Sequence, residues 1–73
     1  VRLDGWLSLA RAEISANLEV APELAFPGRL MRKIRSRIVE TGARAQGAEV
    51  FDGWRRELIS PAFVDFARRS GDA

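Results

Sequence analysis

The stretch Pro27–Val39 places apolar and basic side chains on opposite faces of one predicted helix. Its apolar residues recur at i, i+1, i+4 and i+8, and at about 100° per residue these positions share one face: Leu30, Met31, Ile34 and Ile38. The opposite face carries Arg29, Arg32, Lys33 and Ser36, with Arg35 and Arg37 on its flanks. One element therefore supplies both an anchor for a core and a basic surface.

The basic face has two interpretations. A run of charge is commonly a solvated helix face, and the alternative is a surface that contacts phosphates. Eleven of the twelve basic residues are Arg, whose planar fork of donors suits phosphate and carboxylate groups. The formal net charge is only +2, so the distribution of charge says more than its total.

The size and composition of the chain are typical of one small domain. Seventy-three residues lie near the lower end of what folds on a single core. The chain has no Cys, and hence no disulfide or thiolate–metal framework, which is compatible with an intracellular, cytoplasmic protein. No apolar run approaches the roughly 18 residues of a membrane span. The chain begins at Val1 rather than Met, so we expect it to be a fragment of a longer protein.

Apolar spacing before the basic stretch predicts a first helix from about Asp4 to Asn17, with Asp4 as its N-cap. Its stripe consists of Leu3, Leu7, Ala10, Ile14 and Leu18, flanked by Trp6. Residues 18–26 are expected to form a connector with one helical turn over residues 21–24, because a proline suits the first position of such a turn. The expected apolar anchors of this connector are Val20, Leu24 and Phe26.

After the basic helix, Gly42 is expected to lie just past the helix end. Residues 43–47 are weakly patterned and are expected to form a loop. Asp52 is expected to cap a short helix that reaches residue 59, and Ser60, which precedes a proline, is expected to cap the last helix. Residues 70–73 are expected to fray.

These patterns predict an all-α fold, a compact bundle of four to five short helices, because no segment has the period of a strand. The expected core is made of Trp6, Leu7, Ile14, Leu30, Ile34, Ile38, Trp54, Leu58, Phe63 and Phe66.

Catalytic chemistry is not expected in this chain. Without His or Cys there is no Ser–His or Cys–His nucleophile and no zinc ligand set. The carboxylates are scattered along the sequence, whereas a two-metal nuclease site needs several that converge. We therefore expect no catalytic residue, no metal ligand and no cofactor. Binding to a membrane surface is also disfavoured, because the apolar residues of the basic helix are needed for the core.

Residues 52–66 resemble the closing motif of ribonuclease D, in which a Gly-Trp-Arg-x-Glu-Leu helix is followed by a short helix rich in Leu and Phe. The matching positions here are Gly53, Trp54, Arg55, Glu57 and Leu58. The upstream order is also similar to the second helicase-and-RNase-D C-terminal (HRDC) domain of that family, so the likeness covers roughly residues 7–67.

This resemblance implies a five-helix accessory domain, residues 1–73, that binds RNA such as tRNA precursors or other single-stranded nucleic acid. The parent would be a metal-dependent 3′→5′ exoribonuclease, a hydrolase whose catalytic acids and divalent metal belong to a separate domain. The catalytic domain and a sister HRDC domain of the same chain are the other expected partners. The predicted nucleic-acid contacts are Arg29, Arg32, Lys33, Arg35, Arg37, Arg55 and Arg56.

Several alternatives stay open. Within the motif, a structural hydrogen bond or stacking role for Arg55 is favoured over a phosphate contact. Trp6 and Trp54 would stack on bases if they were exposed, but their apolar spacing favours the core. The whole domain would alternatively dock on its neighbours with little RNA affinity, or belong to a RecQ-type helicase and bind single-stranded DNA. The Gly-Trp-Arg motif favours ribonuclease D.

Overall fold

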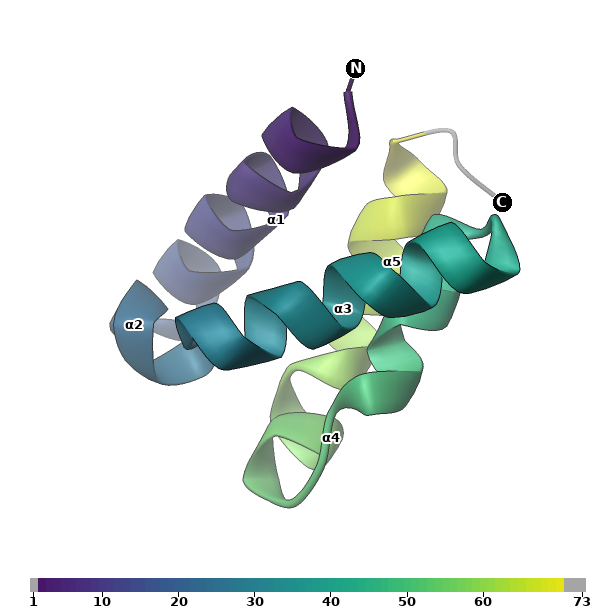
Figure 1. The fold of residues 1–73 in the computed structure, drawn as a ribbon. Helices are drawn as coiled ribbons and strands as arrows, with labels where there is room; N and C mark the ends of the chain where they lie inside the picture. Colours follow the sequence, from purple (N-terminus) through teal and green to yellow (C-terminus); the bar gives the residue numbers. More distant parts are fainter. Residues whose placement is uncertain (1, 71–73) are drawn as a thin grey trace.

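The computed structural model describes residues 2–70, and every regular element in that range is a helix (Figure 1). The elements are α1 (Leu3–Leu18), α2 (Pro22–Ala25), α3 (Gly28–Thr41), the 3₁₀-helix η1 (Arg44–Val50), α4 (Trp54–Leu58) and α5 (Ser60–Arg69). The predicted all-α bundle of short helices is therefore confirmed. The radius of gyration is 10.8 Å, close to the roughly 11 Å of a compact chain of this length.

The ends of the basic helix α3 follow the sequence closely. Pro27 is its N-cap residue, and Gly42 ends it in the left-handed conformation with φ of 77°. The Gly42 N–H donates to the Ile38 carbonyl at 2.7 Å, which satisfies one of the carbonyls left open at a helix end. The predicted helical turn in the connector is also confirmed as α2.

The prediction that Asp4 caps the first helix is wrong. α1 begins at Leu3 with Arg2 in the N-cap position, so Asp4 lies inside the first turn. A carboxylate there still suits the positive end of the helix dipole. Asp4 also pairs with Arg35 of α3, whose Nε lies 2.8 Å from its Oδ1.

The predicted caps of the two last helices are wrong as well. Gly53, not Asp52, is the N-cap residue of α4, and the Asp52 carboxylate accepts a hydrogen bond from the Gly53 N–H at 3.1 Å. Ser60 is the first residue of α5. Ile59 lies between α4 and α5 and adopts a right-handed helical conformation. A capping side chain requires an extended residue before the helix, and the chain has none at this point.

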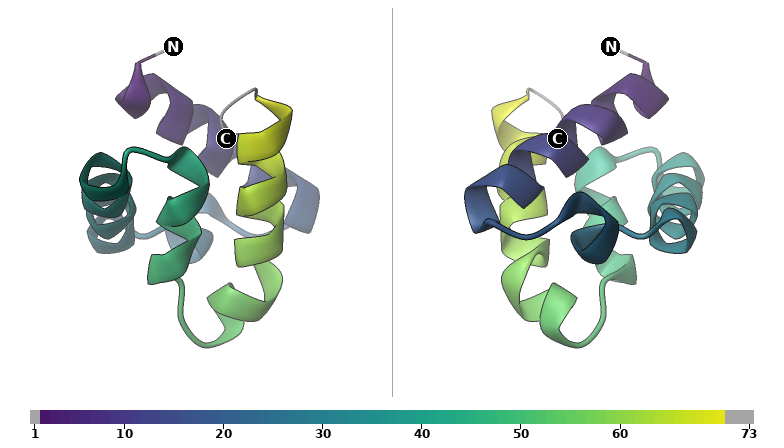
Figure 2. Two further views of the ribbon diagram at one scale, coloured as in Figure 1. Left: turned by 90° about the vertical axis from the view of Figure 1, so that its right-hand side faces the viewer. Right: turned by 90° about the vertical axis from the view of Figure 1, so that its left-hand side faces the viewer.

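Residues 43–47 were expected to form a loop, but most of them belong to η1. η1 packs between α3 and α5, and Figure 2 shows it beside α5. Gly47 makes this packing possible: a Cβ atom built there would lie 3.0 Å from side-chain carbons of Ile34 and Ile38. The close approach to α3, rather than local helix propensity, therefore explains why this weakly patterned segment is ordered.

Aromatic rings form a continuous chain through the core. The Trp6 ring lies 5.5 Å from that of Phe63 and 5.3 Å from that of Phe66, measured between centroids. Phe63 continues to Phe51 at 5.6 Å, and Phe51 to Phe26 at 5.8 Å. Most of these pairs meet edge to face, a geometry that contributes about 0.5–1.5 kcal/mol per pair beyond the burial of area. The chain joins α1, α5 and the two segments that precede α3 and α4.

The predicted core is right for the long helices except at Leu30, which is only partly buried, and it is wrong for α4. Trp54 and Leu58 are 45% and 46% exposed, and the expected connector anchor Leu24 is 59% exposed. Phe51 and Ile59 are buried in their place. α4 is too short to present a stripe to the core, and the residues that flank it enter the core from outside the helix, where helical spacing carries no signal.

The expected fraying does not begin at Ser70. Its Oγ accepts a hydrogen bond from Trp6 Nε1 at 3.0 Å and donates one to the Ala67 carbonyl at the same distance. The remaining part of that prediction, residues 71–73, lies outside the described residues.

We expect Gly47→Ala to destabilise the domain by about 1–3 kcal/mol, because the added methyl group overpacks the contact with Ile34 and Ile38. Gly28→Ala is the matched control, because its Cβ would meet only the flexible end of Arg32 at 3.9 Å. Urea denaturation of both variants measures the difference. Equal stability of the two variants would contradict the proposed role of Gly47.

Candidate nucleic-acid interface

Three exposed cations of α3 have no side-chain partner within residues 2–70. Arg29, Arg32 and Lys33 are exposed on the first turns of the helix, while Ile34 and Ile38 are buried on its other side. Within residues 2–70, none of the three cations forms a hydrogen bond or an ion pair. We call Arg29, Arg32 and Lys33 the α3 cation cluster.

The cation cluster lines a shallow groove on one side of α3. One part of the groove is lined by Arg29, Arg32, Lys33, Ser36, Arg37, Glu40 and Val50. The adjoining part shares three of these residues and adds Pro27, Leu30, Asp52 and Arg55. The acids in the lining are Glu40 and Asp52. The residues that line both parts are Arg29, Lys33 and Val50, so this shared stretch is cationic and contains one apolar side chain.

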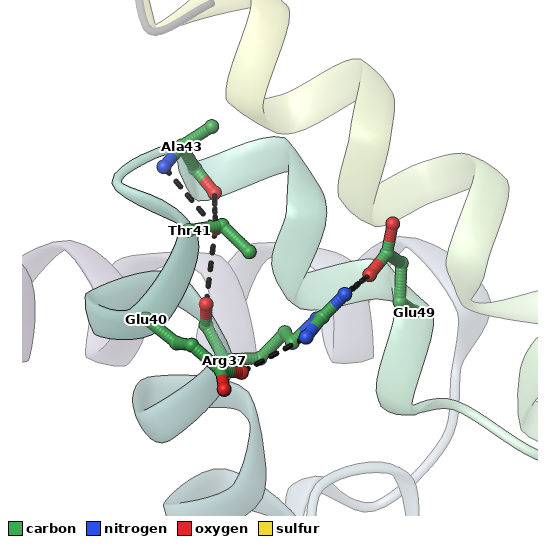
Figure 3. Close-up of polar contacts among 5 residues, drawn as sticks. All are labelled: Arg37, Glu40, Thr41, Ala43 and Glu49. Carbon is green, nitrogen blue, oxygen red and sulfur yellow. Dashed lines mark hydrogen bonds and ion pairs between the residues drawn. The ribbon is translucent and has the colours of Figure 1, made fainter.

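The second half of α3 differs, because its predicted contacts are already engaged inside the domain. Arg35 pairs with Asp4 of α1. Arg37 donates from Nε to Glu49 of η1 at 2.7 Å and from Nη1 to Glu40 at 2.9 Å (Figure 3). Exposed pairs of this kind stabilise a fold only weakly, but they reduce the charge that Arg35 and Arg37 offer to an external anion.

The two carboxylates around Arg37 raise the pKa of its guanidinium, first through the hydrogen bond to Glu49 and then through that to Glu40. Because the pKa of Arg37 is higher in the folded state, its contribution to the stability of the fold is complete at every pH below the ordinary pKa of arginine. That contribution is lost only as the pH rises through the pKa of the folded state. That window lies in strong alkali, so Arg37 is charged throughout the working range.

Arg55 has the structural role that its place in the motif favours. Its Nη2 donates to the Leu24 carbonyl at 2.7 Å, and its Nε lies 3.2 Å from the carbonyl oxygens of Leu24 and Ala25. Its guanidinium also lies 4.7 Å from the centre of the Trp54 ring. Arg55 therefore ties α4 to the end of α2 and supports Trp54 from one side.

Arg56 does not belong to the same surface. It is exposed and lines a separate groove between η1 and α5 with Glu49 and Arg68. The seven predicted contacts thus fall into four groups. Three form the α3 cation cluster, Arg35 and Arg37 are paired within the domain, Arg55 has a structural role, and Arg56 lines the separate groove.

The prediction from helical spacing is wrong for Trp54. Trp54 was assigned to the core, yet it is exposed, whereas Trp6 is buried as expected. A signal for exposure was present in the sequence: Trp54 directly follows Gly53, which adopts φ of 60° and ψ of −136°. This conformation strongly favours glycine, so the glycine before Trp54 indicates a turn at the start of α4.

Among residues 2–70, no three Asp or Glu side chains come together as a metal-binding group. No helix in the described part of the chain is long and apolar enough to cross a membrane. Comparisons with protein-family models, with curated proteins and with solved structures found no match for the chain.

We expect Arg55→Ala to lower the free energy of unfolding by about 1–3 kcal/mol, because it removes the hydrogen bonds that a charged guanidinium donates to the carbonyls of Leu24 and Ala25. Arg56→Ala removes the same charge from a neighbouring exposed position and is expected to change stability by less than about 0.5 kcal/mol. Thermal or urea unfolding compares the two. If Arg55→Ala were as stable as Arg56→Ala, the structural role would be refuted.

Proposed function

We propose that the chain is a nucleic-acid-binding accessory domain that holds the phosphate backbone of an RNA strand against the α3 cation cluster. Phosphate contacts of this kind position a strand without reading its sequence. The role fits a chain whose α3 offers a cationic surface. Binding would be weak and strongly dependent on salt, because each neutralised phosphate releases counterions.

The observation that carries this proposal is the position of the cluster on its helix. Arg29 lies in the first turn of α3, where the helix dipole is positive and a cation is unfavourable, and Arg32 and Lys33 follow in the next turn. Arg29 and Lys33 are also four residues apart, a spacing at which like charges repel. No acid lies in the first turn. The arrangement lowers the stability of the free domain, and a bound phosphate would relieve both effects.

The wider assignment rests on the resemblance at residues 52–58. In this proposal the chain is an HRDC domain of a ribonuclease D-like 3′→5′ exoribonuclease that processes the 3′ ends of tRNA precursors and other RNA. The hydrolytic chemistry and its divalent metal would belong to another domain of the parent. The observed contacts of Arg55 support this reading, because they give the Arg of the motif a structural reason to be present.

A second candidate function is domain docking with little RNA affinity. It is favoured by the exposed apolar side chains of Leu9, Leu24, Val39, Trp54 and Leu58. The two functions differ in one measurable property, since only a phosphate-binding domain has salt-dependent affinity for RNA when the 73-residue chain is tested alone.

The first test is a salt titration with Arg29→Gln/Lys33→Gln. The probe is a fluorescent unstructured RNA of about 12 nucleotides, within the range that small single-strand sites cover. Log affinity against log salt should lose about 1.4 units of slope in the variant, because each lost phosphate contact accounts for about 0.7 on a single strand. Gln keeps the helix propensity of the replaced residues.

The control is Arg56→Gln/Arg68→Gln, which removes the same charge at the separate groove between η1 and α5. The slope of this control should match that of the unaltered chain. An equal loss in both double variants would contradict a site on α3, and an unaltered chain that binds no RNA at low salt would favour the docking function.

A second test separates binding from stability. Arg29→Glu places an acid in the first turn of α3 and four residues before Lys33, both of which stabilise a helix. We expect the free energy of unfolding to rise by about 0.5–1.5 kcal/mol at low ionic strength, while RNA affinity falls. Urea denaturation and the RNA titration measure the two effects, and a loss of stability together with a loss of binding would argue against the proposal.

A further inference from the structure

Trp54 is held in a fixed position although it contributes little to the core. Its ring takes no part in the aromatic chain that runs from Phe66 through Trp6 to Phe26. The Arg55 guanidinium lies over the ring at 4.7 Å and is itself fixed by hydrogen bonds to Leu24 and Ala25. With this support, 45% of the Trp54 surface is still open to solvent.

The position of Trp54 is set by the turn before it. Gly53 adopts a backbone conformation that other residues rarely tolerate, and the Asp52 carboxylate accepts a hydrogen bond from its N–H. The turn makes Trp54 the first residue of α4, and Trp54 is exposed whereas Phe51 and Ile59, which flank the helix, are buried. An exposed indole that is held by its neighbours loses little conformational freedom when it binds a ligand.

Trp54 also lies next to the cationic groove. Arg55, which supports the ring, lines the same part of the groove as Arg29 and Lys33. The surface thus combines a cationic groove with a supported aromatic ring at its edge. Proteins that bind single strands use this combination: the groove follows the backbone, and the ring stacks on a base.

We propose that Trp54 is a stacking platform for one unpaired nucleobase, so that the ligand of this surface is single-stranded nucleic acid rather than a duplex. The inference rests on the proposed function and adds to it the class of strand. In a duplex the bases are stacked inside the helix and their faces are unavailable. Only a single strand satisfies the cation cluster and the indole ring together.

The test uses Trp54→Ala in the 73-residue chain with three probes of equal length: an unstructured RNA, the same strand without bases, and an RNA duplex. Stacking on an aromatic side chain contributes about 1–3 kcal/mol per base, so Trp54→Ala should weaken binding to the base-bearing strand roughly 5- to 150-fold. Its salt slope should stay unchanged, as should its affinity for the strand without bases and for the duplex.

Two variants serve as controls. Trp54→Phe keeps an aromatic face and should retain most of the affinity. Leu58→Ala removes a side chain of α4 that is exposed to the same degree and should bind as the unaltered chain does. The fluorescence of the unaltered chain should fall when it binds the base-bearing strand, and that of Trp54→Phe should not, because Trp6 is buried.

The outcomes distinguish this inference from the function on which it rests. Unchanged affinity of Trp54→Ala for the base-bearing strand would overturn the stacking platform, while loss of binding in Arg29→Gln/Lys33→Gln would still support the phosphate site. An equal loss on all three probes would also overturn it, since Trp54 would then act through the groove rather than on a base. If the unaltered chain bound none of the probes, both proposals would fall.

Discussion

The contact between α3 and η1 decides which face of the basic helix is left to solvent. Ile34 and Ile38 pack against η1 at Gly47, where there is no room for a side chain without displacing them. Because the two isoleucines are fixed, the positions opposite them have to point outward, and these positions carry the cation cluster. A helix with the same residues but no partner for its apolar face would have no defined orientation. The outward position of the cation cluster is therefore a consequence of the close contact between η1 and the opposite side of α3.

The chain of aromatic rings solves a second problem, that of stabilising so few residues without a disulfide. A domain of this size buries a smaller fraction of its surface than a larger domain does, so each buried side chain has to contribute a large area. Trp6, Phe63 and Phe51 do so from three different elements, and Trp6 also satisfies its N–H through Ser70. Two of the rings come from extended segments just before helices, which ties the connections between helices to the core and limits the movement of α3 and α4.

Much of this fold was predictable from the sequence, and the errors share a physical cause. The long helices α1 and α3 were found because their apolar residues repeat over several turns, and Gly42 marked the end of α3. The prediction failed where a segment is ordered by its neighbours: η1 has weak local preference and forms against α3. It failed again at Trp54, because helical spacing over a five-residue helix does not reveal which side is covered. The three residues of the cation cluster are among the predicted contacts, but pairing across the fold is not visible in the sequence, so the division between free and engaged residues was not predicted.

The division between unpaired and paired cations of α3 explains how a nearly neutral domain offers a cationic surface. The acids that neutralise α3 come from three places, Asp4 on α1, Glu49 on η1 and Glu40 on α3 itself, and all of them meet the second half of the helix. Toward its start the helix has no such partner among the described residues, although a single acid there would also favour the helix dipole. The acids thus pair with the cations of the second half, Arg35 and Arg37, and leave Arg29, Arg32 and Lys33 unpaired within residues 2–70. A net charge near zero and a local site for phosphate are compatible because the pairing acids gather at one half of the helix and the unpaired cations lie in the other.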